Sequence, residues 1–143
     1  MKQAQVEKLG REWQARLLLD RWEIEWQVFP ASYVNEERHL GNCATDTDTL
    51  TATISIAAKR PSAEIESTII HELLHLVVAP LAAAGRLAAG RLSSEAAEIM
   101  ADVIDAEAER AVRCLERVIA SHASGSFMEF NRAGRKRGSK WPT

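Results

Sequence analysis

The pattern of hydrophobic and polar positions predicts one helix and two strands before residue 60. Apolar side chains recur every three or four residues over roughly 2–19, which predicts an amphipathic helix. Over 22–28, two tryptophans, an isoleucine and a valine alternate with polar residues, as in a half-buried strand. The Thr- and Ile-rich run 50–57 also alternates and predicts a second strand. The polar segment 31–49 between them predicts a loop or an irregular hairpin.

A helix with one apolar face is predicted over 61–78. Proline is common in the first turn of a helix, and Pro61 stands at that position. Pro80 is expected to break or kink the helix, because a proline inside a helix removes a backbone hydrogen bond. The stretch 82–92 is therefore expected to be a short helical or irregular connection.

A last long helix is predicted to begin at Ser93 or Ser94, either of which can cap it, and to end near His122. Its expected buried stripe consists of Ile99, Met100, Val103, Ile104, Ala111, Cys114, Leu115 and Val118. Helices combined with a small number of strands place the protein in the α+β class. We expect one domain over 1–122, followed by a basic tail over 123–143.

The small net charge of −2 hides an uneven distribution of charge between this tail and the rest of the chain. Five of the 18 lysines and arginines lie in 131–143, which contains no acid. The remainder is acidic, which gives no indication of general nucleic-acid binding. The tail also contains Trp141, and basic residues with an aromatic can contact phosphates and stack on a base. A solvated terminus is the commoner role of such a tail, so nucleic acid is not the expected partner.

Cysteine spacing and the N-terminal pattern indicate the compartment. Cys43 and Cys114 have no CxxC spacing, which favours free thiols in a reducing environment. The first residues mix charged and apolar side chains and do not resemble a signal peptide. The longest apolar run, 76–84, contains a proline and is short for a membrane span. The expected protein is soluble and cytoplasmic, without a membrane partner.

The chemistry-bearing motif is His71-Glu-Leu-Leu-His75, an HExxH sequence inside a predicted helix. Residues four apart lie on the same helix face, so both imidazoles can bind one Zn²⁺ ion. Glu72 lies beside the ion without having to bind it. From there it can act as the general base that takes a proton from the attacking water.

Catalytic zinc usually has three protein ligands, so a third is needed. The last helix offers Glu98 and, four residues later, Asp102, on one face away from the apolar stripe. Glu98 is the predicted third ligand, and Asp102 the residue that orients a histidine. A solvated acidic face is the alternative interpretation, and Glu95, one turn earlier, is the alternative ligand. His39 or His122 in this role would indicate a different subclass.

The HExxH helix followed by a helix with Glu-x-x-x-Asp resembles the gluzincin branch of the zincin metallopeptidases. Over roughly 5–120 the order of elements is similar to the minimal phage- and prophage-associated members, and more distantly to the ImmA/IrrE type. The resemblance implies a small sheet packed against the HExxH helix and a C-terminal glutamate helix. It implies zinc held by His71, His75 and Glu98, and Glu72 as the base.

The resemblance also implies that the strand 50–57 borders the cleft and pairs with an extended peptide or protein substrate. The chain departs from larger gluzincins because it lacks a subdomain with an oxyanion-stabilising His or Tyr. Tyr33 is its only tyrosine and lies in the predicted loop.

Two functions from different classes fit these residues. The first is a zinc-dependent peptidase, and the second is a noncatalytic or partner-activated zinc-binding regulatory module. Glu72 favours the first, because a structural zinc site needs no such acid and is more often closed by four ligands, commonly cysteines.

Overall fold

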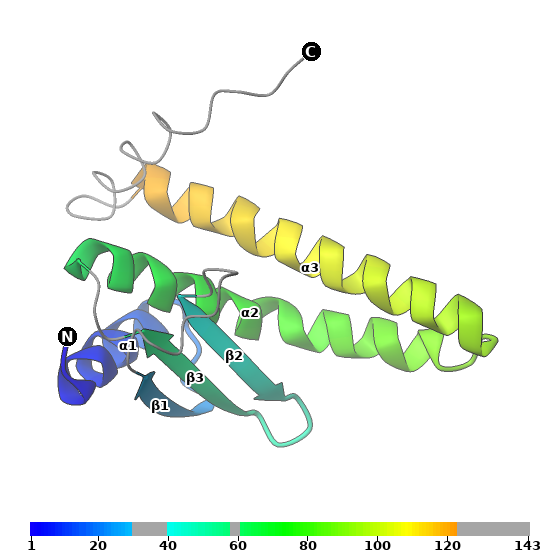
Figure 1. The fold of residues 1–143 in the computed structure, drawn as a ribbon, viewed down its shortest axis with the longest axis horizontal. Coiled ribbons are helices and arrows are strands. Elements are labelled where there is room, and N and C mark those ends of the chain that lie inside the picture. Colours follow the sequence, from blue (N-terminus) through cyan, green and yellow to red (C-terminus); the bar gives the residue numbers. More distant parts are fainter. Residues whose placement is uncertain (30–39, 58–60, 123–143) are drawn as a thin grey trace, which may run out of the picture.

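The computed structural model describes residues 1–29, 40–57 and 61–122. In this part the chain is α+β, with three helices and a three-stranded sheet (Figure 1). The elements in order are α1 (Gln3–Arg16), β1 (Glu23–Phe29), β2 (Gly41–Asp46), β3 (Thr51–Ala57), α2 (Ser62–Ala89) and α3 (Ser94–His122). The first and last predicted helices and both predicted strands are confirmed to within a few residues, whereas α2 runs well past its predicted end at 78. β2 lies in the segment predicted as a loop or irregular hairpin.

The sheet has the strand order β1-β3-β2, so β3 is its central strand. β1 pairs with β3 in parallel, and β2 pairs with β3 antiparallel. Alternate residues of β3 are buried, among them Ile54 and Ile56, and they join one core with Ile69 and Leu73 of α2. Burying each such side chain contributes roughly 1.5–3 kcal/mol, so this contact fixes α2 against the sheet.

Helix α1 completes the core beside β1. Val6 and Trp13 are buried, and Trp13 donates a hydrogen bond through Nε1 to Glu66 of α2. Gly10 lies against the ring of Trp26, where a Cβ atom would clash with the indole. α1 therefore packs against both β1 and α2, and these contacts help to fix the position of the helix that carries HExxH.

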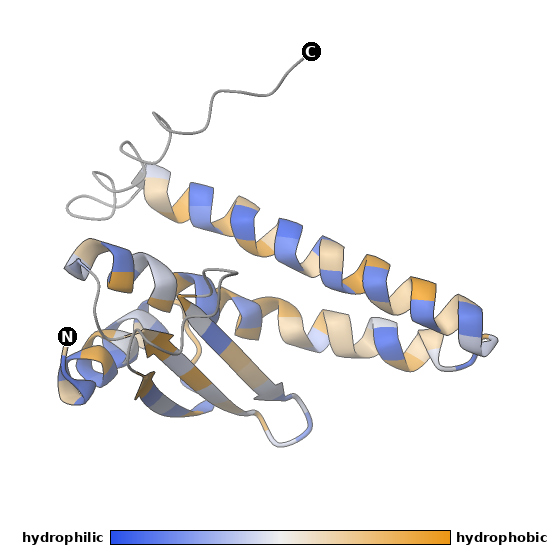
Figure 2. Cartoon of the chain, in the orientation of Figure 1, coloured by the Kyte–Doolittle hydropathy of each residue, from blue (hydrophilic) through white to orange (hydrophobic). Residues whose placement is uncertain are grey.

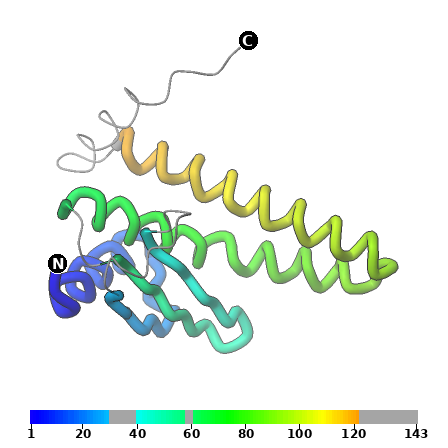
Figure 3. The backbone as a smooth tube through the Cα atoms, viewed as in Figure 1, coloured from blue at the N-terminus to red at the C-terminus, as the bar shows by residue number. Residues whose placement is uncertain are grey.

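Helix α2 continues through Pro80 to Ala89, so the predicted break and the irregular connection are wrong. Pro80 is exposed, and its ring costs the helix one backbone hydrogen bond. Packing against α3 compensates for this loss, because Gly85 lies closely against Ile104, and Ala82 and Ala89 are buried. Figure 3 shows α2 and α3 running antiparallel, side by side, as a hairpin.

Much of the stripe predicted to be buried on α3 is exposed. The exposed large apolar side chains on the hairpin are Val77, Leu81, Leu87, Leu92, Ile99, Met100, Val103 and Val118. Cys114 is exposed as well. For the residues near the turn, the physical reason is that the hairpin extends past the sheet, and Figure 2 shows apolar positions continuing along both helices to that turn. Instead, Val112 and Ala120 are buried on α3.

Among the described residues, α2 is the helix whose length and composition would allow it to cross a membrane, with a mean hydropathy of 1.5 in its most apolar window. The helix is this long because it does not end at Pro80, although the longest apolar run is still 76–84. Core helices of globular proteins meet the same criteria, and α2 packs against the sheet, α1 and α3.

Candidate metal centre

His71 and His75 lie one turn apart on α2 and direct their Nε2 atoms at each other, 3.2 Å apart. Their rings are nearly perpendicular, at 75°, with centroids 5.0 Å apart. Both side chains are about three-quarters covered, because α3 packs over this face of α2. The pair confirms the predicted placement of the motif on a single helix face.

Glu109 of α3 supplies a carboxylate to the histidine pair. Its Oε2 lies 3.8 Å from Nε2 of His71 and 3.5 Å from Nε2 of His75. The three donor atoms all lie within 4.8 Å of one another. Zinc ligands at about 2.0–2.1 Å in a tetrahedral arrangement are about 3.3 Å apart, so these separations fit one zinc ion. Two imidazoles and one carboxylate also form the donor set of several catalytic zinc sites.

The structure does not bring Glu98 or Glu95 to the histidines. Both are exposed, and Glu109 lies eleven residues after Glu98, about 16 Å further along the helix axis. Asp102 is likewise exposed and away from His71. Among the described residues, the carboxylate that joins the histidine pair is therefore Glu109 and not the predicted Glu98.

The correction has a simple geometric cause. Helix α2 runs 14 residues beyond His75 before the turn. Because α3 returns antiparallel to α2, a residue of α3 reaches the level of His75 only after a similar number of residues. Glu109 is the fifteenth residue after Ser94, at that level. A helix expected to continue through Pro80 would have pointed to Glu109, because Glu109 and His75 are about equally many residues from the turn. His39 and Tyr33, and the side chain of His122, lie outside the described residues.

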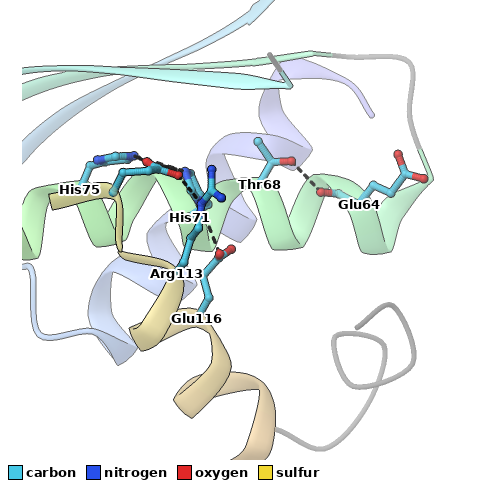
Figure 4. A network of polar contacts seen from close by, with 7 residues as sticks. Glu64, Thr68, His71, His75, Arg113 and Glu116 are labelled. Carbon is cyan, nitrogen blue, oxygen red and sulfur yellow. Dashed lines mark hydrogen bonds and ion pairs between the residues drawn. The ribbon is translucent and has the colours of Figure 1, made fainter. Parts of the chain in front are cut away.

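A second layer of polar contacts orients the candidate ligands (Figure 4). Oε2 of Glu116 lies 3.3 Å from Nδ1 of His71, on the ring nitrogen that faces away from the donor cluster. Nε of Arg113 donates a hydrogen bond of 2.8 Å to Oε1 of Glu109. Glu116 thus takes the position that Asp102 was expected to hold. Such carboxylate–histidine contacts fix the ring orientation and strengthen the ligand.

The charges around the two histidines shift their pKa values in opposite directions. The hydrogen bond and charge of Glu116 raise the pKa of His71, although burial works against this. Burial, together with the charge of His71, lowers the pKa of His75. Burial is the largest single influence on the pKa of Glu109 and raises it, but the hydrogen bond from Arg113 and the charges of His71, Arg113 and His75 together outweigh burial, so the pKa is lowered. Glu109 is therefore ionised, as a metal ligand has to be.

Glu72 is buried, with 6% of its surface exposed, where the start of β2 crosses α2. A cavity of about 770 Å³ opens beside it and is lined by α2, α3 and the residues Gly41, Asn42 and Cys43. A Cβ atom on Gly41 would lie only 2.6 Å from Oε1 of Glu72 and 2.7 Å from Cγ2 of Thr68. Glycine at position 41 is what allows β2 to lie directly against the predicted base.

If the site belongs to a zinc peptidase, Gly41→Ala is expected to lower the rate of peptide cleavage strongly while zinc stays bound, because the added methyl group displaces Glu72 and not the histidines or Glu109. Zinc content and cleavage rate of the purified variant check this. Gly90→Ala is the control, since a Cβ atom there meets nothing closer than 3.6 Å. Loss of zinc from Gly41→Ala, or unchanged activity, would contradict the role given to this contact.

The predicted contact between strand 50–57 and an extended substrate needs correction. β3 pairs with β1 on one side and β2 on the other, so its backbone groups are already used within the sheet. β2 is an edge strand, and its first residues line the cavity. An extended chain entering the cavity would therefore meet β2.

Cys43 lines the same cavity but does not belong to the donor cluster. Burial, with a contribution from the charge of Glu72, raises the pKa of its thiol to about 12. At neutral pH the side chain is therefore a protonated thiol, the weaker form as a metal ligand. Both cysteines are free, as predicted.

Comparison with protein-family models, curated proteins and solved structures gives no match for this chain. The functional argument therefore depends on the geometry of the donor cluster, Glu72 and the cavity.

Proposed function

We propose that the protein is a zinc-dependent peptidase with a minimal zincin-like fold of the gluzincin type. His71, His75 and Glu109 are the proposed ligands, and Glu72 is the proposed general base. The observation that carries this proposal is the convergence of the three donors beside a buried glutamate at the wall of an open cavity. Three protein donors leave a position for water or substrate, as catalytic zinc requires.

Zinc, when bound, supplies a Lewis acid that polarises the scissile carbonyl group and makes a nearby water more acidic. Glu72 accepts a proton from the attacking water and then passes it to the leaving amine. Burial of Glu72 keeps its carboxylate at a fixed place next to the ligands. Glu116 holds His71 in the orientation that directs Nε2 at the ion.

An extended peptide backbone is the substrate conformation that the cavity favours. Gly41, Asn42 and Cys43 bring the backbone of an edge strand to the cavity wall. An edge strand can pair with an incoming extended chain through main-chain hydrogen bonds. Such pairing would hold a peptide bond across the donor cluster largely independently of its side chains.

We place this activity in the cytoplasm, since both cysteines are free and Cys114 is exposed. The noncatalytic or partner-activated zinc module is the competing proposal. A closed structural site would have a fourth protein ligand, whereas three donors gather here among the described residues.

Metal analysis of the purified protein, combined with a peptide-library cleavage assay, tests the proposal. We expect one zinc per chain, loss of cleavage after chelation, and recovery on adding zinc back. Zinc without cleavage of any peptide would favour the regulatory module. A protein that binds no zinc would exclude both.

A further inference from the structure

Arg113 is the permanently charged cation among the residues that line the cavity in the described part of the chain. It lies on α3 one turn after Glu109 and three residues before Glu116. Its neighbours are thus the candidate ligand on one side and the carboxylate that contacts His71 on the other (Figure 4).

The two oxygens of Glu109 have different partners. Oε1 accepts the hydrogen bond from Nε of Arg113 at 2.8 Å, whereas Oε2 faces Nε2 of both histidines. A carboxylate can offer both oxygens to one ion or only one of them. A charge-assisted bond to Oε1 favours the second arrangement, since binding through both oxygens would compete with it.

The orientation of Glu109 needs such a constraint. Its side chain is 34% exposed and comes from a helix that packs against α2. A glutamate has several rotatable bonds, and fixing them has an entropic cost of up to about 1.5–2 kcal/mol. Arg113, one helical turn away, restricts the rotamers of Glu109 before zinc binds, so less conformational entropy is lost on binding.

We propose that Arg113 is a positioning residue of the metal centre. Its Nε–H group holds Oε1 of Glu109, so that Oε2 is the single carboxylate oxygen directed at the ion and one coordination position stays open for the reaction. This inference depends on the proposed zinc site and adds to it the residue that sets the binding mode of the third ligand.

Substitution of Arg113 by Met and by Lys separates this role from a general effect of charge. Methionine removes the donor but keeps an unbranched apolar stem. Lysine keeps the charge but has no fixed planar donor at the Nε position. The matched control is Arg110→Met, because Arg110 lies on the same helix and pairs with Glu107 outside the donor cluster, at 2.6 Å.

Two measurements besides activity report on the metal centre directly. Zinc affinity is measured by competition with a chelator, and the visible spectrum of the Co²⁺-substituted protein reports the coordination number. We expect Arg113→Met to weaken zinc binding by up to about 10-fold, because the Arg113 side chain is 64% exposed and solvent screens the pair, and to shift the Co²⁺ spectrum towards higher coordination. Arg113→Lys should recover only part of both, and Arg110→Met should match the wild type.

Unchanged zinc affinity and an unchanged Co²⁺ spectrum in Arg113→Met would overturn the proposal. Full recovery in Arg113→Lys would also overturn it, because charge alone would then suffice. Failure of the wild type to bind zinc would instead overturn the proposed function. Circular dichroism of each variant shows whether the fold is retained, so an unfolded variant is not mistaken for loss of the metal.

Discussion

Glu72→Gln is expected to keep the fold and the zinc and to lower the rate of peptide cleavage by about 10²–10⁴-fold or more. Glutamine has nearly the same shape as glutamate, so the contact with Gly41 is preserved. Its amide cannot accept a proton from the attacking water. The cleavage rate of a peptide chosen from the library, measured alongside zinc content, gives the result.

Glu98→Gln is the matched control for this experiment, since it makes the same chemical change at an exposed position on α3. It should cleave the peptide at the wild-type rate. If Glu72→Gln cleaved equally fast, the hydrolysis would come from another site or from a contaminating enzyme. The noncatalytic zinc module would then be the better interpretation.

The helix that carries HExxH could be predicted from sequence because its signal is local. Both histidines and Glu72 lie within five residues, and the period of their apolar neighbours is that of a helix. Tertiary packing then adds Glu109 from α3 and leaves the arrangement of these three residues on the helix unchanged. Strands β1 and β3 could be predicted for the same reason, since each alternates within its own seven residues.

Strand β2 carries no comparable signal. It contains Gly41, Asn42 and Asp46, which are residue types depleted in strands. It is a strand because β3 provides hydrogen-bond partners along its whole length. Only this pairing brings Gly41 against Glu72, so the edge that borders the cavity could not be assigned from sequence.

Prediction of the third candidate ligand depended on how far α2 extends beyond His75, and tertiary packing decides this length. A break at Pro80 would make the hairpin short and bring an early acid of α3 to the histidines. The continuous α2 instead carries the turn 14 residues beyond His75, and the matching acid comes correspondingly later. Packing of Gly85 against Ile104 is part of what keeps the helix intact there.

Glu109→Gln is expected to lower zinc affinity by more than the roughly 10–100-fold that loss of an outer partner costs, because it replaces the one charged ligand by a neutral amide oxygen, which is a much weaker zinc ligand. His71→Ala and His75→Ala should each abolish stoichiometric binding. Chelator competition and metal content of the purified variants provide the measurement.

Comparison of four glutamates along α3 makes this prediction specific to the geometry. Glu116→Gln should cost an intermediate amount, about 10–100-fold, since its carboxylate contacts the Nδ1 side of His71 and not the ion. Glu95→Gln and Glu98→Gln should bind zinc as the wild type does, because both side chains are exposed near the turn. A large loss in Glu98→Gln with full affinity in Glu109→Gln would move the ligand back towards the turn. That result would require α2 and α3 to pack in a different register from the one that places Oε2 of Glu109 within 3.8 Å of both histidines.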